Sequence, residues 1–230
     1  MSNETSLSSK KLNKLLANVS RTQARVARLY PGDGGARQPV HTVYGGAQLF
    51  KSDTVHKLGT LALRMLETYA PNPAALASAI GMDPSLAETV YPRVVAKLRT
   101  EAVEDFRIDF EDGYGIRPDA EEDAHAVEAA AQVARGMAEH TLSPFIGIRI
   151  KPLSRELAPR SLRTLDLFLT ALCKATGGVL PSRFVVTLPK VLDKGDVETC
   201  VDALEQLESA LGLPAGVIKL EIMIETTQSV

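Results

Sequence analysis

Charged residues recur at one kind of position in this sequence, the carboxyl end of a stretch that alternates apolar and polar side chains. They are Glu111, Asp112, Arg149, Lys151, Lys190 and Glu225. Carboxylates with Arg and Lys around them suit a hard divalent cation that holds a carboxylate-bearing substrate. In barrels and open α/β sheets, chemistry sits at the carboxyl ends of the strands. If the stretches are neighbouring parallel strands, these side chains can line one pocket mouth.

The stretch from Phe106 to Glu111 shows the pattern most clearly. Its apolar side chains alternate with Arg107, Asp109 and Glu111, which is the period of a strand. A barrel strand can carry both faces, because the apolar face packs on helices and the other lines the barrel interior. Arg107 and Asp109 lie early in this strand, as Glu221 does in a later one. We therefore expect these three residues to form an interior ion-pair layer rather than to act in catalysis.

The elements that must position these residues alternate between strand and helix. Strands are predicted over residues 41–44, 106–112, 145–151, 184–190 and 220–225, and helices over about 10–30, 54–69, 73–98, 119–140, 161–176 and 196–211. Gly45 and Gly46 are expected to stop the first strand. Asp119 and Glu122 are spaced as a capping box at the start of the fourth helix.

Regular alternation with a repeat of about 35–40 residues is typical of parallel βαβ units, so the fold class is α/β. Strands of an open doubly wound sheet are normally apolar on both faces, whereas three of the five strands here have one charged face. This favours a TIM (β/α)₈ barrel. A complete barrel needs eight strands and about 250 residues, so we expect only the first five strands in this chain. The domains predicted are an N-terminal amphipathic helix and linker, 1–35, and an incomplete TIM-barrel domain, 36–230.

The predicted helix over residues 10–30 has leucine and valine on one face and lysine and arginine on the other. We expect it to pack against the domain that follows. A mitochondrial transit peptide is the alternative, although no cleavage site is evident.

Composition narrows the classes of partner and compartment. With 26 basic and 28 acidic residues, the net charge of −2 predicts no attraction to nucleic acid or to a membrane. No apolar run is long enough to span a bilayer. Cys173 and Cys200 lie far apart on the apolar sides of helical patterns, which indicates buried, reduced thiols. A cytoplasmic protein is therefore expected.

Four short motifs carry a resemblance to a known family. Asp109-Phe-Glu-Asp112, Arg149-Ile-Lys151, Leu188-Pro-Lys190 and Ile224-Glu-Thr226 resemble, in order and spacing, motifs of the citrate lyase beta-subunit group. That group belongs to the HpcH/HpaI aldolase superfamily of magnesium-dependent barrel lyases. The resemblance covers about residues 40–230 and is closest to a divergent branch without an assigned substrate.

The resemblance implies roles for individual residues. Arg149 would bind the substrate carboxylate and steady the enolate oxygen, and Glu225 would bind Mg²⁺ (or Mn²⁺). Glu111 and Asp112 would form the acidic pair of the metal and base shell, and Lys190 would lie near the pocket. Glu111 is thus the second predicted metal ligand, and Asp112, Lys190 and Arg149 are the predicted catalytic residues.

The sequence departs from the family pattern at two places. Lys151 stands where the pattern has Asn, and we take it with Arg149 as a substrate-binding residue. Gly45-Gly46 stands where the family has its usual phosphate-side motif after the first strand. Whether the protein uses a coenzyme A thioester therefore stays open. The family's second metal aspartate follows the fifth strand, beyond Val230.

The function that the resemblance implies is that of a carbon–carbon lyase or aldolase. It would act on a 2-oxo acid or a carboxylate through an enolate, with Mg²⁺ polarising the carbonyl. We expect a homo-oligomer at full length, and the 230-residue chain alone to be partly molten and inactive.

Two other functions stay open. A Schiff-base aldolase would use Lys151 or Lys190 as its amine. A non-catalytic binding module would keep the fold without turnover.

Overall fold

The computed structural model describes residues 5–32 and 34–230 of the chain. It divides into two compact units, Met1–Gln38 and Pro39–Val230, and each is considered by itself. The division falls a few residues beyond the predicted domain boundary at residue 35.

The first unit holds one helix, α1 (Ser9–Leu29), close to the predicted range of 10–30. The helix has Arg28 in its last turn and no acidic residue in its first. None of its residues is buried. Packing of this helix on the second unit stays a prediction.

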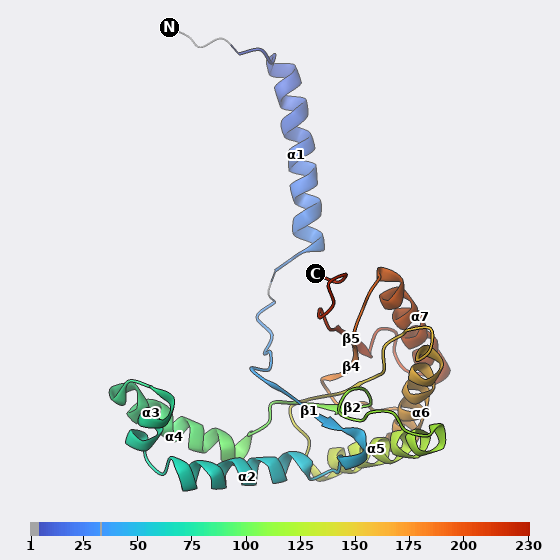
Figure 1. Ribbon diagram of the computed structural model, residues 1–230. Helices are drawn as coiled ribbons and strands as arrows, with labels where there is room; N and C mark the ends of the chain where they lie inside the picture. Colours follow the sequence, from blue (N-terminus) through green and yellow to red (C-terminus); the bar gives the residue numbers. More distant parts are fainter. Residues whose placement is uncertain (1–4, 33) are drawn as a thin grey trace. The chain divides into compact units, whose positions relative to one another are not determined.

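The second unit is built on a sheet of five parallel strands in the order β1-β2-β3-β4-β5 (Figure 1). The strands are β1 (Thr42–Gly46), β2 (Asp105–Asp109), β3 (Phe145–Arg149), β4 (Phe184–Leu188) and β5 (Lys219–Ile222). Each strand pairs with the next one in sequence, and the register places Asp109 beside Arg149. The predicted α/β class with a parallel sheet is confirmed.

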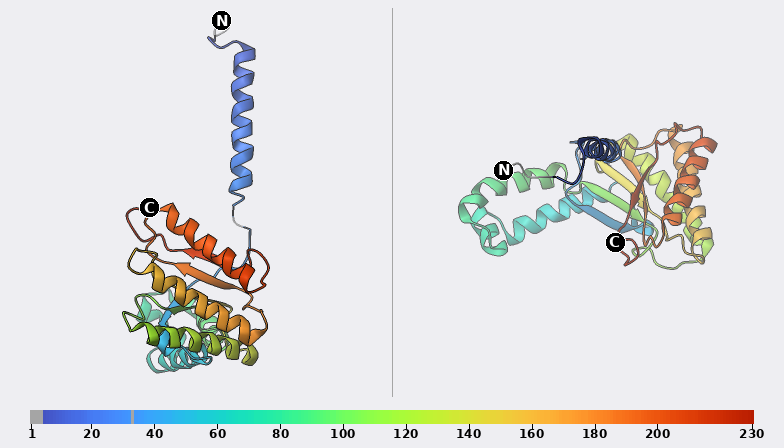
Figure 2. Two further views of the ribbon diagram at one scale, coloured as in Figure 1. Left: turned by 90° about the vertical axis from the view of Figure 1, so that its right-hand side faces the viewer. Right: turned by 90° about the horizontal axis from the view of Figure 1, so that it is seen from above.

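The helices of the second unit form two groups. They are α2 (Thr54–Tyr69), α3 (Pro73–Ile80), α4 (Pro84–Thr100), α5 (Asp119–Glu139), α6 (Ala158–Thr176) and α7 (Lys194–Ala210), with a short 3₁₀ helix, η1 (Ala47–Leu49). α5, α6 and α7 lie side by side over one face of the sheet (Figures 1 and 2). α2, α3 and α4 pack on one another and extend away from the sheet.

The single helix predicted over residues 73–98 is wrong, because the chain forms α3 and α4 there. Gly81 ends α3 in the left-handed region at φ 68°. The Asp83 side chain then accepts hydrogen bonds from the backbone N–H groups of Ser85 and Leu86 and begins α4. A Pro at N1 of α4 strengthens this second start.

The predicted capping box at the start of α5 is also wrong. The N-cap of α5 is Pro118, without a side-chain hydrogen bond, and Glu122 is buried instead. A capping box does occur at α7, between Asp193 and Asp196. Glu122 does not cap the helix, because its carboxylate forms an ion pair with the ammonium of Lys151, 2.8 Å away.

The first strand runs through the two glycines that were expected to stop it. A Cβ atom at Gly45 would lie 2.6 Å from Cζ of Phe106, and one at Gly46 would lie 2.3 Å from the carbonyl oxygen of Gly113. The glycines therefore allow β1 to lie close against β2 and the turn after it. They are part of the sheet rather than its boundary.

The core lies between the apolar face of the sheet and α5 and α6. Fully buried aliphatic and aromatic side chains meet there: Phe106, Ile108, Phe110, Ile146, Ile148, Leu165, Phe168 and Leu169. The rings of Phe168 and Phe184 are stacked at 5.9 Å. The predicted alternation is confirmed, since the apolar side chains of β2 face the helices and the charged ones face the other way.

The charged face of the sheet carries the predicted ion-pair layer in altered form. Arg107 pairs with Asp105 and with Glu221, at 2.8 Å to the Glu221 carboxylate. Its Nε also donates to Thr187 Oγ1 at 3.1 Å. Asp109 was expected in this layer but pairs with Arg149 instead. The reason is register, because Asp109 ends β2 directly beside the end of β3.

Among the described residues, no helix is long and apolar enough to cross a membrane.

Candidate functional site

The candidate site lies at the carboxyl ends of β2 to β5, on the face of the sheet that bears the charged residues. Asp109 organises its first part. One carboxylate oxygen accepts from the backbone N–H of Glu111 at 2.9 Å, and the other accepts from that of Gly113 at 2.6 Å. A Cβ atom at residue 113 would lie 2.6 Å from that second oxygen, so the turn needs glycine. Asp109 thereby shapes the turn that presents Glu111 and Asp112.

Arg149 meets Asp109 with two parallel hydrogen bonds. Nε to Oδ1 is 2.8 Å and Nη2 to Oδ2 is 2.6 Å, the bidentate geometry of an Arg–carboxylate pair. The guanidinium also lies 4.5 Å over the ring of Tyr44. Burial alone would lower the pKa of Arg149, but the hydrogen bonds and charge of Asp109 raise it. Arg149 was expected to bind a substrate carboxylate with two hydrogen bonds. Its Nε and Nη2 atoms already donate to Asp109.

Glu111 is the buried carboxylate of the site, with 8% of its surface exposed. Its Oε1 forms an ion pair with the ammonium of Lys190. Its Oε2 lies 3.2 Å from Nη1 of Arg149 yet makes no hydrogen bond. A buried carboxylate oxygen without a donor is costly, so this atom is the point where a further cation or donor would be stabilised most.

Lys190 connects three strand ends. Its ammonium contacts Glu111 and lies 3.1 Å from the Asp112 carboxylate, both after β2. Its backbone N–H donates to Oε1 of Glu225, after β5, at 2.8 Å. The backbone of Lys190 sits at φ 50°, a region that non-glycine residues rarely adopt and that is concentrated at functional sites.

The residues present fit a hard cation in donor chemistry. Glu111, Asp112 and Glu225 supply carboxylate oxygens, and Mg²⁺ is commonly held by one or two carboxylates together with water and substrate oxygens. Among the described residues, no group of three or more His, Cys, Asp or Glu side chains is placed to hold a metal ion. The Lys190 ammonium lies between Glu111 and Asp112 and neutralises both. A divalent cation there would compete with this ammonium.

Lys151 does not join the cluster. β3 ends at Arg149, so the strand alternation that predicted a shared face for Arg149 and Lys151 stops before Lys151. Its ammonium is buried on the helix side, 2.6 Å from the carbonyl oxygen of Phe110 and 2.8 Å from Glu122. It also lies 4.9 Å over the ring of Tyr114.

Sequence reasoning missed the residues that surround Lys151. Glu122 also accepts from Thr164 Oγ1 at 2.7 Å, and the hydroxyl of Tyr114 lies 2.8 Å from Nδ1 of His125. Burial, with the charge of Glu122, raises the pKa of Tyr114 to about 12. An available signal was that Glu122 lies four residues before Ala126 on the buried face of α5.

Tyr44 was also missed at the main cluster. Burial, with the charge of Glu221, raises the pKa of Tyr44, so its hydroxyl keeps its proton. The signal was its place two residues after Thr42, on the inward side of β1.

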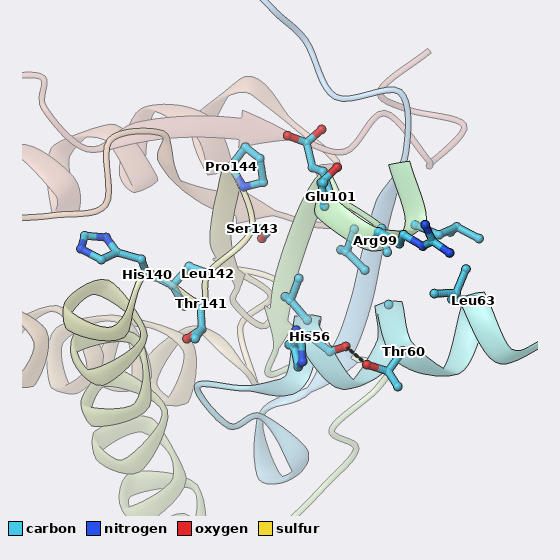
Figure 3. Close-up of a pocket in the computed structure, with 16 residues that line it drawn as sticks. His56, Thr60, Leu63, Arg99, Glu101, His140, Thr141, Leu142, Ser143 and Pro144 are labelled. Carbon is cyan, nitrogen blue, oxygen red and sulfur yellow. Dashed lines mark hydrogen bonds between the residues drawn. The ribbon is translucent and has the colours of Figure 1, made fainter. Parts of the chain in front are cut away.

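Figure 3 shows a pocket of about 430 Å³ that lies away from this cluster. His56, Thr60 and Leu63 come from α2, and the segment His140–Pro144 precedes β3. It therefore opens at the amino ends of the strands. A second pocket, of about 640 Å³, adjoins the cluster through Lys190 and Glu225, with Leu153, Leu157 and Leu192 as apolar walls.

The fold and the cluster define an α/β protein with a parallel sheet whose carboxyl edge carries paired carboxylates, an arginine and a lysine. The chain belongs to a family described as a domain of unknown function, DUF6986, whose model matches residues 19–230. None of the curated proteins compared with the chain matches it.

Proposed function

We propose that the chain carries the active site of a Mg²⁺-dependent carbon–carbon lyase related to the citrate lyase beta-subunit group. The substrate would be a 2-oxo acid or another small carboxylate. In this proposal the five parallel strands are the first strands of a TIM (β/α)₈ barrel, whose chemistry lies at the carboxyl edge. The sequence motifs support it, because four of them bring residues to that edge.

The observation that carries the proposal is the environment of Glu111. Its carboxylate is buried between two cations, Lys190 on one oxygen and Arg149 beside the other. A buried carboxylate with one unsatisfied oxygen is an expensive arrangement in a purely structural role. Charged side chains gathered at the carboxyl ends of parallel strands are typical of functional sites.

Each residue of the cluster has a role that follows from its position. Asp112 is exposed at the mouth, with a side chain 68% accessible, and can move a proton to or from a bound molecule. Lys190 and the Nη1 edge of Arg149 offer positive charge to a substrate oxygen. Asp109 keeps the Arg149 guanidinium in one orientation. A bound divalent cation would supply further positive charge where negative charge develops on the substrate.

The Schiff-base alternative is less well supported by the geometry. Lys151 is buried in a pair with Glu122, and Lys190 is paired with Glu111 and Asp112. In a Schiff base the lysine nitrogen bonds to the carbonyl carbon of the substrate, whereas both of these nitrogens already contact carboxylates of the chain. Trapping with borohydride and pyruvate would give a covalent adduct only by the lysine route.

Titration of the 230-residue chain with Mn²⁺, followed by electron paramagnetic resonance, tests the proposal. We expect Glu111→Gln to weaken Mn²⁺ binding by about 10–100-fold, because the substitution removes a charged oxygen ligand. Glu198→Gln is the matched control, since Glu198 is an exposed carboxylate paired with Lys194 on α7. Equal affinities in the wild type and Glu111→Gln would remove Glu111 from a metal site. Cleavage of 2-oxo acids by the full-length protein that survives a chelator would contradict the metal-dependent lyase.

A further inference from the structure

The charge of this protein is divided between its two units. Residues 1–38 contain seven basic and two acidic residues, which leaves 19 basic and 26 acidic residues in 39–230. The second unit therefore has a net charge of −7 and the first a net charge of +5. The net charge of the whole chain, −2, is the sum of these two opposite charges. The prediction of no attraction to a membrane rested on that sum alone.

α1 concentrates the positive charge. All six of its charged residues are basic, and it contains no Asp or Glu: Lys10, Lys11, Lys14, Arg21, Arg25 and Arg28. At 3.6 residues per turn, five of them follow one line along the helix. The helix is about 30 Å long at 1.5 Å per residue and is drawn as one continuous element in Figure 1.

The opposite face of α1 is apolar along its whole length. It consists of large aliphatic side chains that are each at least 40% exposed: Leu12, Leu15, Leu16, Val19, Val26 and Leu29. A helix with one basic face and one continuous apolar face has the composition of helices that lie in the plane of a membrane interface. The apolar residues enter the acyl boundary and the basic ones meet anionic headgroups.

We propose that α1 binds the surface of a bilayer that contains anionic lipids. Nucleic acid would use the basic face but leave the apolar face in water. A second copy of α1 would bury the apolar face but bring six further positive charges beside the first six. An anionic lipid surface is the occupant that satisfies both faces.

The surfaces of the second unit fit the two faces of α1 less well than an anionic lipid surface does. Exposed apolar side chains gather on α2, α3 and α4, namely Leu61, Met65, Tyr69, Ile80 and Leu86. Those three helices carry five basic and two acidic residues, so this apolar surface is itself cationic. The acidic helices α5 and α7 expose one large apolar residue each, Val127 and Val201.

Flotation of the 230-residue chain with lipid vesicles tests the proposal. We expect binding to vesicles of phosphatidylcholine and phosphatidylglycerol at 7:3, and at least tenfold weaker binding to pure phosphatidylcholine. The double variant Arg21→Gln/Arg25→Gln should bind the anionic vesicles about 30-fold more weakly, because two headgroup-facing charges are lost. The double variant Leu15→Ser/Leu16→Ser keeps the charge and should also lose binding.

The matched control is Lys57→Gln/Lys194→Gln, which removes two exposed charges from the second unit and should leave binding unchanged. Three results would overturn the proposal. They are equal binding to neutral vesicles, full binding by Leu15→Ser/Leu16→Ser, and a dimer in light scattering that this variant dissociates while no vesicle binding is seen. The first two leave α1 without a lipid-specific role, and the third assigns its apolar face to a second copy.

Discussion

Asp109 is the residue on which the candidate site depends most. It accepts four hydrogen bonds, two from backbone N–H groups of its own turn and two from Arg149. Removing one of these donors would leave an oxygen of a buried carboxylate without its hydrogen bond, which is costly. The pair is therefore a structural support for Glu111 as well as a part of the site.

At the residue scale we predict that Arg149→Lys lowers the free energy of unfolding by about 2 kcal/mol. Lysine keeps the charge but loses the planar fork, so one oxygen of Asp109 is left without its charged donor. Urea unfolding followed by circular dichroism measures the loss. Arg163→Lys is the control, because Arg163 also contacts both oxygens of a carboxylate, that of Asp123, but on the exposed surface, and its replacement should leave stability unchanged. A similar loss in both variants would contradict the special role of the buried pair.

Among the elements, β3 can lie close to β4 because Gly147 has no side chain. Gly147 pairs with Val185 of β4, and a Cβ atom at residue 147 would lie 2.2 Å from the Val185 carbonyl oxygen. The contact is with backbone, which cannot rotate away as a side chain can. Glycine at this position lets β3 and β4 approach, and so brings Arg149 and Lys190 to one edge.

At the element scale we predict that Gly147→Ala destabilises the sheet by about 2 kcal/mol or more, because the strands must separate locally. The midpoint of thermal unfolding measures this effect. Gly34→Ala is the control, since nothing lies within 4 Å of a Cβ atom at that residue. A Gly147→Ala variant as stable as the Gly34→Ala variant would show that β4 can move aside without cost.

For the molecule as a whole, the packed layer is the one between the sheet and its helices. The apolar face of the sheet is covered by α5, α6 and α7, while β1 and β5 are the edge strands of the described sheet. Cys173 and Cys200 lie on the buried sides of α6 and α7 and are free thiols. They report directly on whether this layer is packed.

At the scale of the molecule we predict that an aromatic disulfide reagent modifies neither thiol at pH 8 until the chain unfolds, and both in denaturant. Burial raises the pKa of Cys200 to about 11 and raises that of Cys173, so little thiolate is present at that pH. The rate of modification measures this protection, since Cys173 is 7% exposed and Cys200 0% in the folded chain. Rapid modification of both thiols without denaturant would show that this layer is not packed.

Local pattern was sufficient for most of the elements. Period-two alternation located all five strands, and helical periodicity located the helices to within a few residues, except that residues 73–98 form two helices instead of one. Pattern failed where a tertiary contact decides the outcome. Gly45 and Gly46 act as a turn signal in isolation but allow close approach inside β1. Glu122 fits a cap by spacing but is taken by Lys151.

The sequence by itself determined most of the residues that reach the carboxyl edge, because alternation within each strand sets the face and the end of each side chain, and Lys151 is the exception. Only the tertiary structure decided how they pair. Asp109, expected in a layer below the site, holds Arg149 because the register of β2 and β3 places them side by side. Lys151 turns to the helices because β3 ends at Arg149. Ion pairing depends on distances between side chains of different strands. The periodicity within one strand carries no information about those distances.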